Sequence, residues 1–417
     1  MFAFLFSASL LAQESELAAL SSWVAIDAPT GHEHLAIEKI QSKYTGWDHD
    51  SYGNLFKVVG RGEPRRVVAC ALDSYSYAVS QITDAGYLRL HRIGSGSSHP
   101  LWDQAHEGQQ LRILTRSGPV VGVTAVANGH FAAQHRNETA IITQNDLWLD
   151  VGAESATEVA DMGIALLDPA LRHFPAWSYT NEVAGPRAGA RVGCAALFAA
   201  AEAGVNGGSG STKYLISVQQ VFGWIGLGAG VSSDANADEI IVLGVGSTDF
   251  DDRVVDGLGT RADAVLTGNG KAEIRLITPA VTDADALMER MSLASANQVL
   301  EALVEAINPD AQRPAWLAAP QQAAVLNNEA SRWGRSDNSD RLQEIEALLD
   351  QVAEKSAVPG HEGPIRNAIY NTMPEWAKEI AQTDEMGNMW VEVGPAGQAT
   401  VFLAHMDEVG YEVESID

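Results

Sequence analysis

The sequence predicts an α/β fold in which a sheet flanked by helices carries an inserted small β-barrel domain. Apolar segments of strand length and helix length alternate after residue 166, which favours a parallel or mixed sheet. Residues 75–165 differ, because short alternating segments are separated there by Gly, Ser and Asn. An internal repeat is the third observation, since residues 341–417 reproduce residues 15–83.

Composition limits the classes of protein and partner. The 417 residues include 54 acidic and 27 basic side chains, which gives a formal net charge of −27. Such a charge repels nucleic acid and anionic lipid, so we expect no nucleic-acid partner and no membrane partner. The two cysteines, Cys70 and Cys194, are too few for a disulfide framework or a thiolate zinc site, and their apolar neighbours predict core positions.

The first twelve residues are apolar and precede the charged segment Gln13–Glu16. This pattern is typical of a signal peptide, here a partial one without basic residues at its start. A cleaved leader predicts a periplasmic or secreted protein, whereas a leader that packs on the domain leaves a cytoplasmic protein as the alternative. No other stretch approaches the ~20 apolar residues that a membrane span requires.

Local signals predict the helices and strands in chain order. Residues 14–45 predict two amphipathic helices that are separated at Ala28–Gly31. A strand hairpin is expected next, with Asn54–Val59 and Val67–Leu72 joined by a turn at Gly60–Pro64. The later expected elements are three barrel strands, two buried strands and two helices: Leu111–Thr115, Val120–Thr124 and Ala140–Thr143, then Lys213–Val218 and Glu239–Gly244, then Arg191–Ala203 and Asp283–Ile307.

The internal repeat is clearest at a turn and the strands that follow it. Asp384–Asn388 corresponds to Asp50–Asn54, and from there a constant offset of 334 residues (387 − 53) pairs Asp407 with Asp73. The match continues in register through helix, turn and strands. The chain therefore consists of one whole unit followed by the opening of a second.

The closing stretch carries the strongest chemical motif. Its apolar run Thr400–Ala404 predicts a buried strand that ends in His405-Met-Asp407-Glu408, and a period of two places His405 and Asp407 on one face. That arrangement is typical of a metal ligand and the carboxylate that orients it. With the Asp-x-x-Gly-Asn turn before it, the motif His405–Tyr411 resembles the glutamyl or tetrahedral (TET-type) aminopeptidase family of two-metal metallopeptidases, which includes proteins labelled cellulases.

The resemblance covers residues 15–260 and 341–417. It implies an aminopeptidase/phosphorylase-like sheet, peptide substrates and a homo-oligomer formed through the β-barrel insert. It also implies two divalent metal ions, zinc or cobalt, with His405 as a metal ligand and Asp407 as the residue that orients it. Two such ions polarise the scissile carbonyl and generate hydroxide, with a Glu as general base.

The first copy departs from the family pattern at each chemical position. Ala71 stands where the family has the His ligand, and only Asp73 remains of that motif. The bridging carboxylate is replaced by Gly189 or Ala190, the Glu pair by Gly223 and Trp224, and the next Asp ligand by Gly244. No His occurs between His173 and His361, so the late His ligand is also missing. We therefore expect no metal to be bound by residues 1–340.

The segment Gly31–His34 has two interpretations. His32 and His34 form a His-x-His pattern that is compatible with a metal site. The second copy has Gly363 in place of the second His. The favoured interpretation is therefore a turn that begins a helix, with Glu33 aiding the helix cap.

These observations predict five parts of the chain. They are a partial signal peptide (1–12), a degenerate metallopeptidase-like α/β domain (14–74 and 166–307), an inserted β-barrel domain (75–165), a linker (308–340) and the start of a second metallopeptidase-like unit (341–417). In the last part, residues 400–413 are expected to form an unpaired apolar edge that is mobile, docked on the first unit or prone to aggregate.

Two functions stay open at this point. The first is a metallo-aminopeptidase whose intact gene product joins an inactive first unit to a catalytic second unit. The second is a non-catalytic pseudo-peptidase that acts as a peptide-binding or oligomerisation module. Because residues 341–417 offer only His405 as a metal ligand, we expect little or no activity from this chain alone.

Overall fold

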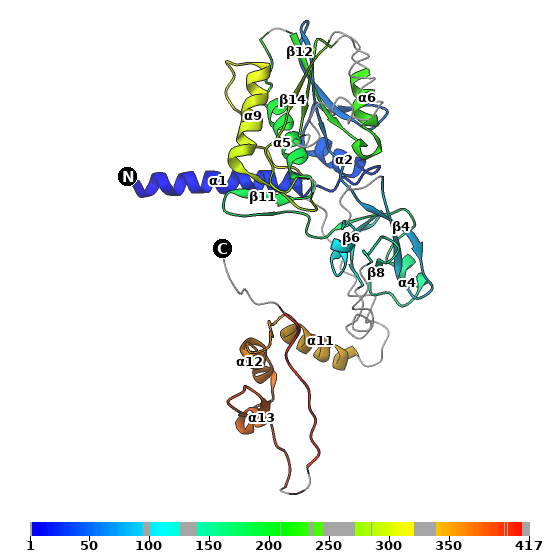
Figure 1. The fold of residues 1–417 in the computed structure, drawn as a ribbon, viewed down its shortest axis with the longest axis vertical. Helices are drawn as coiled ribbons and strands as arrows, with labels where there is room; N and C mark the ends of the chain where they lie inside the picture. Colours follow the sequence, from blue (N-terminus) through cyan, green and yellow to red (C-terminus); the bar gives the residue numbers. More distant parts are fainter. Residues whose placement is uncertain are drawn as a thin grey trace. The chain divides into compact units, whose positions relative to one another are not determined.

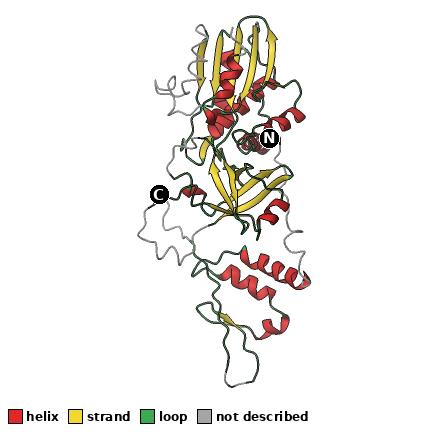
Figure 2. Ribbon diagram, turned by 90° about the vertical axis from the view of Figure 1, so that its right-hand side faces the viewer, coloured by secondary structure: helices red, strands yellow, loops and turns green. Residues whose placement is uncertain are grey.

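The structure, a computed structural model, divides the chain into two compact units, Met1–Asn328 and Glu329–Asp417. Figure 1 labels their elements, and Figure 2 colours them by secondary structure. The described residues are 2–94, 101–125, 140–208, 210–232, 237–244, 272–284, 286–320, 339–395, 397 and 399–410. Among these residues, no helix combines the length and the apolar character needed to span a membrane.

A six-stranded mixed sheet forms the centre of the first unit, in the order β1-β2-β12-β3-β13-β14. Its strands are β1 (Asp48–His49), β2 (Leu55–Arg61), β3 (Arg65–Ala71), β12 (Gly210–Ser217), β13 (Glu239–Leu243) and β14 (Glu273–Ile277). β3 lies between two parallel neighbours, β12 and β13. A strand in this position is buried on both faces, which explains the continuous apolar run Val67–Ala71. The predicted α/β class is confirmed.

Helices cover both faces of this sheet (Figure 1). They are α1 (Phe2–Val24), α2 (His34–Lys43), α5 (Ala188–Glu202), α6 (Ile225–Ser232) and α9 (Leu293–Ile307). α1, α2, α5 and α9 share one apolar core with one face of the sheet, whereas α6 packs on the other face. Along β3, Val68 and Cys70 enter the first core and Val67 and Ala69 enter the second, as the period of two requires.

The inserted β-barrel is confirmed. It closes in the order β4-β5-β8-β7-β6-β9. Its elements are β4 (Tyr77–Ile82), β5 (Leu88–Arg92), the 3-10 helix η1 (Gln104–His106), β6 (Gln110–Thr115), β7 (Gly118–Thr124), β8 (Trp148–Asp150), α4 (Ala156–Asp161) and β9 (Pro169–Arg172). Alternate residues fill its interior, including Val79, Leu111 and Ile113. The strand expected at Ala140–Thr143 is wrong, because these residues have no regular structure.

The hairpin expected between β2 and β3 is also wrong. The short turn exists, but β12 lies between the two strands, antiparallel to β2 and parallel to β3. A turn signal shows that the chain reverses direction, and it carries no information on a strand that comes much later in the sequence. The later strand completes the parallel pairing that buries both faces of β3.

The helix expected over Asp283–Ile307 is shorter than predicted. Residues Glu289–Ser292 form β15, which pairs with β11 (Glu182–Gly185) in a small sheet with β10 (Trp177–Ser178). α9 begins only at Leu293, because the Ser292 side chain caps it by accepting a hydrogen bond from the Ser295 N–H. A local cap and a distant strand partner therefore set this boundary together.

The start of the expected linker is part of the first unit. Trp316 is buried, and the Trp23 indole donates a hydrogen bond of 2.7 Å to the Leu317 carbonyl. Residues 308–320 are thus packed against α1, and the linker expectation is wrong for them. Residues 321–338 lie outside the described residues.

The expected leader is continuous with the first helix. α1 spans residues 2–24 without a break, and its second half buries Leu20 and Trp23 in the main core. Burial in the core explains why this half of the helix has apolar residues. Cleavage of residues 1–12 stays a prediction.

The two cysteines form a disulfide, which the sequence interpretation did not foresee. Cys70 of β3 and Cys194 of α5 are joined, and both are fully buried. Their predicted core positions are confirmed. One disulfide between β3 and α5 is compatible with the expectation that two cysteines are too few for a framework of several disulfides.

The second unit contains α11 (Ser339–Ala353), α12 (Gly363–Thr372), α13 (Glu375–Ile380), β16 (Gln382–Thr383) and β17 (Met389–Trp390). The buried strand expected to lead into His405 is wrong, because residues 399–410 form no strand and have no ladder partner in the described part of the chain. Phe402 and Leu403 are 95% and 94% exposed. This exposure confirms the expected unpaired apolar segment.

One local geometry recurs in both units at the predicted offset. β1 and β2 pair Asp48 with Phe56, and β16 and β17 pair Gln382 with Trp390. In the turns between them, Asp50 and Asp384 make the same set of bonds. In each turn, one carboxylate oxygen accepts from two backbone N–H groups and the other from the side chain of the following Asn.

Candidate functional site

The residues at the family's metal positions meet at one edge of the first sheet. β3, β12 and β13 are parallel, so their carboxyl ends lie together, and α5 begins beside them. Ala71 ends β3, Gly189 lies in the first turn of α5, and Gly244 directly follows β13. The positions that the resemblance assigns to metal ligands therefore lie at one edge of the sheet, and the assignment itself stays a prediction.

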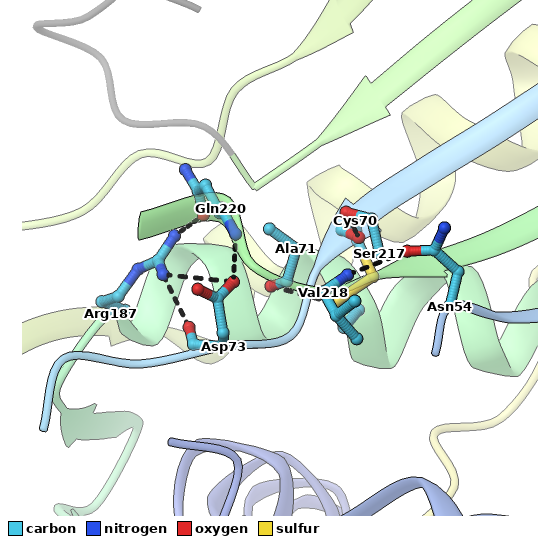
Figure 3. The surroundings of a disulfide bond; sticks show 9 residues. Asn54, Cys70, Ala71, Asp73, Arg187, Ser217, Val218 and Gln220 are labelled. Carbon is cyan, nitrogen blue, oxygen red and sulfur yellow. Dashed lines mark hydrogen bonds and ion pairs between the residues drawn. A yellow bond between two sulfur atoms is a disulfide. The ribbon is translucent and has the colours of Figure 1, made fainter. Parts of the chain in front are cut away.

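Asp73 is the one acidic residue that the first copy retains from the motif, and it is fully buried. Its carboxylate accepts hydrogen bonds from the Thr30 hydroxyl at 2.9 Å and from the N–H groups of Gln220 and Val221 at 3.0 Å each. Arg187 lies 4.0 Å from the same carboxylate and donates to the Asp73 carbonyl at 2.6 Å (Figure 3). These partners make Asp73 a link between β3, α5 and the segment after β12.

Sequence reasoning missed the partners of Asp73. Arg187 is the last residue before α5 and has a φ of 55°, and it also donates to the Gln220 side chain. Figure 3 shows Arg187 and Gln220 converging on Asp73. No spacing in the sequence connects these residues, because they come together only when β12 inserts next to β3.

Ala71 and Trp224 fill an apolar space where the family has a His ligand and a Glu. Both residues belong to the core beneath α6, together with Leu227. Trp224 is 8% exposed and has a φ of 60°, a left-handed conformation that few side chains adopt. An indole there leaves no base to accept a proton from a metal-bound water. Gly223 next to it also has a positive φ, of 86°, and lies in open space.

The end of β13 and the start of α5 are in direct backbone contact. A Cβ atom added to Gly244 would lie 2.7 Å from the Cα of Ala190, and one added to Gly193 would lie 2.8 Å from the Cα of Gly244. Neither distance leaves room for a side chain. A carboxylate ligand at position 244 is therefore excluded by α5 itself.

Gly189 is also enclosed, at the position of the family's bridging carboxylate. A Cβ atom there would lie 2.9 Å from Pro279 and 3.0 Å from Val281. Its N–H donates to the Glu289 carboxylate at 3.1 Å. The two metal ions implied by the resemblance do not fit this site, because the ligand positions hold apolar groups or no side chain.

The His-x-His segment does not build a metal site among the described residues. The rings of His32 and His34 lie 6.0 Å apart, and no group of three or more His, Cys, Asp or Glu side chains able to hold a metal occurs in the described ranges. Burial and the neighbouring His34 lower the pKa of His32, with Asp168 opposing them. Glu33 does not cap α2 as expected, because its side chain accepts a hydrogen bond from the Gln219 N–H at 2.8 Å.

In the second unit, His405 and Asp407 interact as the motif predicts. His405 Nδ1 lies 3.3 Å from the Asp407 carboxylate and 3.0 Å from the Asp407 carbonyl oxygen. The two side chains are 86% and 46% exposed. The contact is compatible with a carboxylate that orients an imidazole, and the role of His405 as a metal ligand stays a prediction.

The comparison with known proteins settles the family. Residues 53–299 match the family model of M42 glutamyl aminopeptidases. The chain belongs to this family. A putative aminopeptidase of Escherichia coli K12, SgcX, is 26% identical over 194 residues, which cover 44% of this chain and 50% of that protein. This chain thus spans about half the length of that curated M42 relative.

Solved structures agree on the fold. An aminopeptidase from the archaeon Desulfurococcus kamchatkensis superposes with a TM-score of 0.58 at 17% identity, covering 75% of this chain and 99% of that one. The TET1 peptidase of Pyrococcus horikoshii gives a TM-score of 0.54 at 19% identity, covering 72% and 99%. The first unit therefore has the fold of these aminopeptidases, and the loss of its metal ligands stays a prediction.

Proposed function

We propose that the first unit is a non-catalytic M42 scaffold within a metal-dependent aminopeptidase, and that peptide hydrolysis belongs to the unit that begins with α11. The observation that carries this proposal is the backbone contact between Gly244 and α5, since it occupies the space of a carboxylate ligand. A two-metal hydrolase needs several ligands and a general base. Among the described positions that the resemblance assigns to the metal site, the first unit supplies only the Asp73 carboxylate, which already accepts three hydrogen bonds.

A binding role for the first unit is the alternative. Its barrel is closed and its sheet is complete, so the scaffold can present a surface without any metal. The TET1 peptidase of P. horikoshii is described as assembling into a tetrahedron or a large octahedral shell. This description favours a homo-oligomerisation module, with the barrel insert as the contacting part, and peptides as the ligand class implied by the family.

Metal titration of the full chain tests the proposal. We expect calorimetry with zinc or cobalt to reveal no stoichiometric two-metal site, and we expect little or no release of an N-terminal residue from peptide substrates. Any single weak metal site should disappear in His405→Ala. A two-metal site of submicromolar affinity that survives in His405→Ala would place metals in the first unit and contradict the proposal.

The compartment is a proposal as well. The buried disulfide between Cys70 and Cys194 supports an oxidising environment, such as the periplasm or the exterior of the cell. An apolar leader at residues 1–12 is consistent with export. Mass spectrometry of the protein from its natural source would distinguish this from a cytoplasmic location, since export predicts an oxidised and shortened chain.

A further inference from the structure

A cavity lies within the first unit, between the barrel, the end of α1 and the start of α5. It has a volume of about 40 Å³ and is bounded by the end of α1, the segment Ser74–Tyr77, β6, β9 and the first turns of α5. Arg191 of α5 reaches this cavity, and its side chain is 1% exposed. The cavity shares no residue with the positions that hold metals in the M42 pattern.

Arg191 is a buried cation whose Nε and Nη1 atoms have no hydrogen-bond partner among the described residues. Burial lowers the pKa of Arg191 to about 9, so the guanidinium still carries its charge at neutral pH. The carboxylates of Asp73, Asp27 and Glu33 favour this charge, but they leave the two nitrogen atoms without an acceptor. Burying donors of a charged group without acceptors costs free energy, which a bound acceptor would recover.

The other charged groups of the lining do not accept a hydrogen bond from Nε or Nη1 of Arg191. Asp27 is paired with Arg112, which also donates to the His173 carbonyl at 2.9 Å. His106 is uncharged at neutral pH, because burial lowers its pKa to about 4. Arg172 adds another cation. The lining thus carries three guanidinium groups and one carboxylate, an excess of positive charge.

We propose that this cavity binds a small carboxylate of about acetate size, held by the Arg191 guanidinium and the Ser76 hydroxyl. The Ser76 hydroxyl is another buried polar group of the lining that lacks a hydrogen-bond partner among the described residues. A cavity of 40 Å³ has room for about three water-sized groups. Val24, Leu111 and Leu287 supply apolar contacts for a methyl group. A ligand ammonium group would meet only the carboxylate of Asp27, which Arg112 already pairs, so the site disfavours amino acids.

Thermal unfolding of the full chain tests the site with acetate as the probe. In a carboxylate-free buffer, sodium acetate should raise the melting temperature with a saturable dependence, beyond the effect of sodium chloride at equal ionic strength. Arg191→Met should weaken acetate binding by at least about tenfold, since it removes the charged hydrogen bonds. Arg290→Met, a control on β15 away from the cavity lining, should bind acetate as the unchanged chain does.

NMR of carbon-13 acetate gives a second test, which does not require Arg191→Met to fold. The unchanged chain should broaden the acetate resonance, and Ser76→Ala should reduce this broadening even if Arg191→Met fails to fold. Equal effects of acetate and chloride, an absence of saturable acetate binding, or full binding by Arg191→Met would each overturn the proposal. These outcomes do not depend on peptidase activity or on metal.

Discussion

At the scale of single residues, Asp73 is a structural link within the first unit. Asp73 is fully buried, and its carboxylate accepts one side-chain and two backbone hydrogen bonds. In the second unit the equivalent Asp407 is half exposed beside His405. The Asp73 carboxylate thus links three segments, whereas the Asp407 carboxylate contacts the His405 imidazole.

Removing the Asp73 carboxylate should destabilise the first unit strongly. Asp73→Ala leaves the buried Thr30 hydroxyl and two N–H groups without acceptors and Arg187 without its counter-ion, which predicts a loss of about 3–5 kcal/mol. Urea unfolding followed by tryptophan fluorescence measures it. Asp407→Ala is the matched control and should leave the first unit's transition unchanged. A loss below about 1 kcal/mol for Asp73→Ala would show that the link is dispensable.

At the scale of elements, α5 is joined to two neighbouring strands, to β3 by a disulfide and to the end of β13 by close backbone packing. The disulfide joins Cys70 to Cys194, and α5 touches the end of β13 through glycines at positions 193 and 244. In a two-metal enzyme, ligands from these same elements would be held together by the ions. Here a covalent bond and backbone packing hold the same elements together, so metal is not needed for their arrangement.

Reduction of the disulfide should therefore destabilise the fold, whereas chelation of metal ions should not. The disulfide closes a loop with a sequence separation of 124 residues, and loop-closure entropy predicts about 4–5 kcal/mol of stabilisation. Dithiothreitol should lower the midpoint of urea unfolding, and EDTA should not change it. The double variant Cys70→Ala with Cys194→Ala should match the reduced protein and no longer respond to dithiothreitol. Destabilisation by EDTA would reveal a structural metal.

Two glycines with similar backbone conformations give a second comparison at this scale. Gly244 and Gly223 have φ values of 77° and 86°, so Ala at either position costs about 1–2 kcal/mol in backbone strain. Gly244→Ala should cost a further amount of about 1–3 kcal/mol, because its Cβ atom overlaps Ala190, whereas Gly223 lies in open space. Thermal or urea unfolding measures both. Equal losses for the two variants would contradict the close packing of α5 on β13.

At the scale of the whole molecule, the two units differ in the structure that their described residues form. The first unit has a six-stranded sheet and a closed barrel, while the second has helices, one short strand pair and an exposed apolar segment. Phe402 and Leu403 are nearly fully exposed, and Val409 is 100% exposed. Apolar side chains exposed in one segment promote association.

Polar side chains in place of Phe402 and Leu403 should make the chain less prone to aggregate. Phe402→Ser with Leu403→Ser should reduce binding of a hydrophobic dye and slow aggregation, while the melting temperature of the first unit stays the same. Dye fluorescence, light scattering and calorimetry measure the three properties. Replacing two exposed apolar residues of the first unit, Leu166 and Leu167, provides the matched control. A fall in the melting temperature would show that Phe402 and Leu403 pack on folded structure.

The sequence predicted the elements of the fold better than their pairing. The apolar run of β3, the helix α5 and the barrel strands β6 and β7 have local signals, and these predictions are confirmed. The position of β12 between β2 and β3 has no local signal, so a hairpin was expected instead. Residues 289–292 were expected in a helix and form β15 for the same reason, since their partner β11 lies far away in the sequence.

The sequence assigned positions to the candidate site but did not show what surrounds them. Ala71, Gly189 and Gly244 could be assigned because they lie at the ends of recognisable strands or at the start of a recognisable helix, and their correspondence to metal ligands stays a prediction. The disulfide was missed because neither cysteine has a spacing motif, and only the fold brings β3 and α5 together. Arg191 was missed because guanidinium nitrogen atoms without an acceptor become visible only when every neighbouring acceptor is known.

The duplicated turn at Asp50 and Asp384 gives the chain an internal reference for measuring tertiary packing. Asn54 is fully buried and also bonds the Gly226 carbonyl and the Val218 N–H, whereas Asn388 is exposed and retains only the bonds within its turn. Amide hydrogen exchange at the two Asn residues therefore compares one motif in two environments within a single sample. The ratio of their exchange rates reports the free energy that the surrounding sheet adds to a turn already closed by its own Asp.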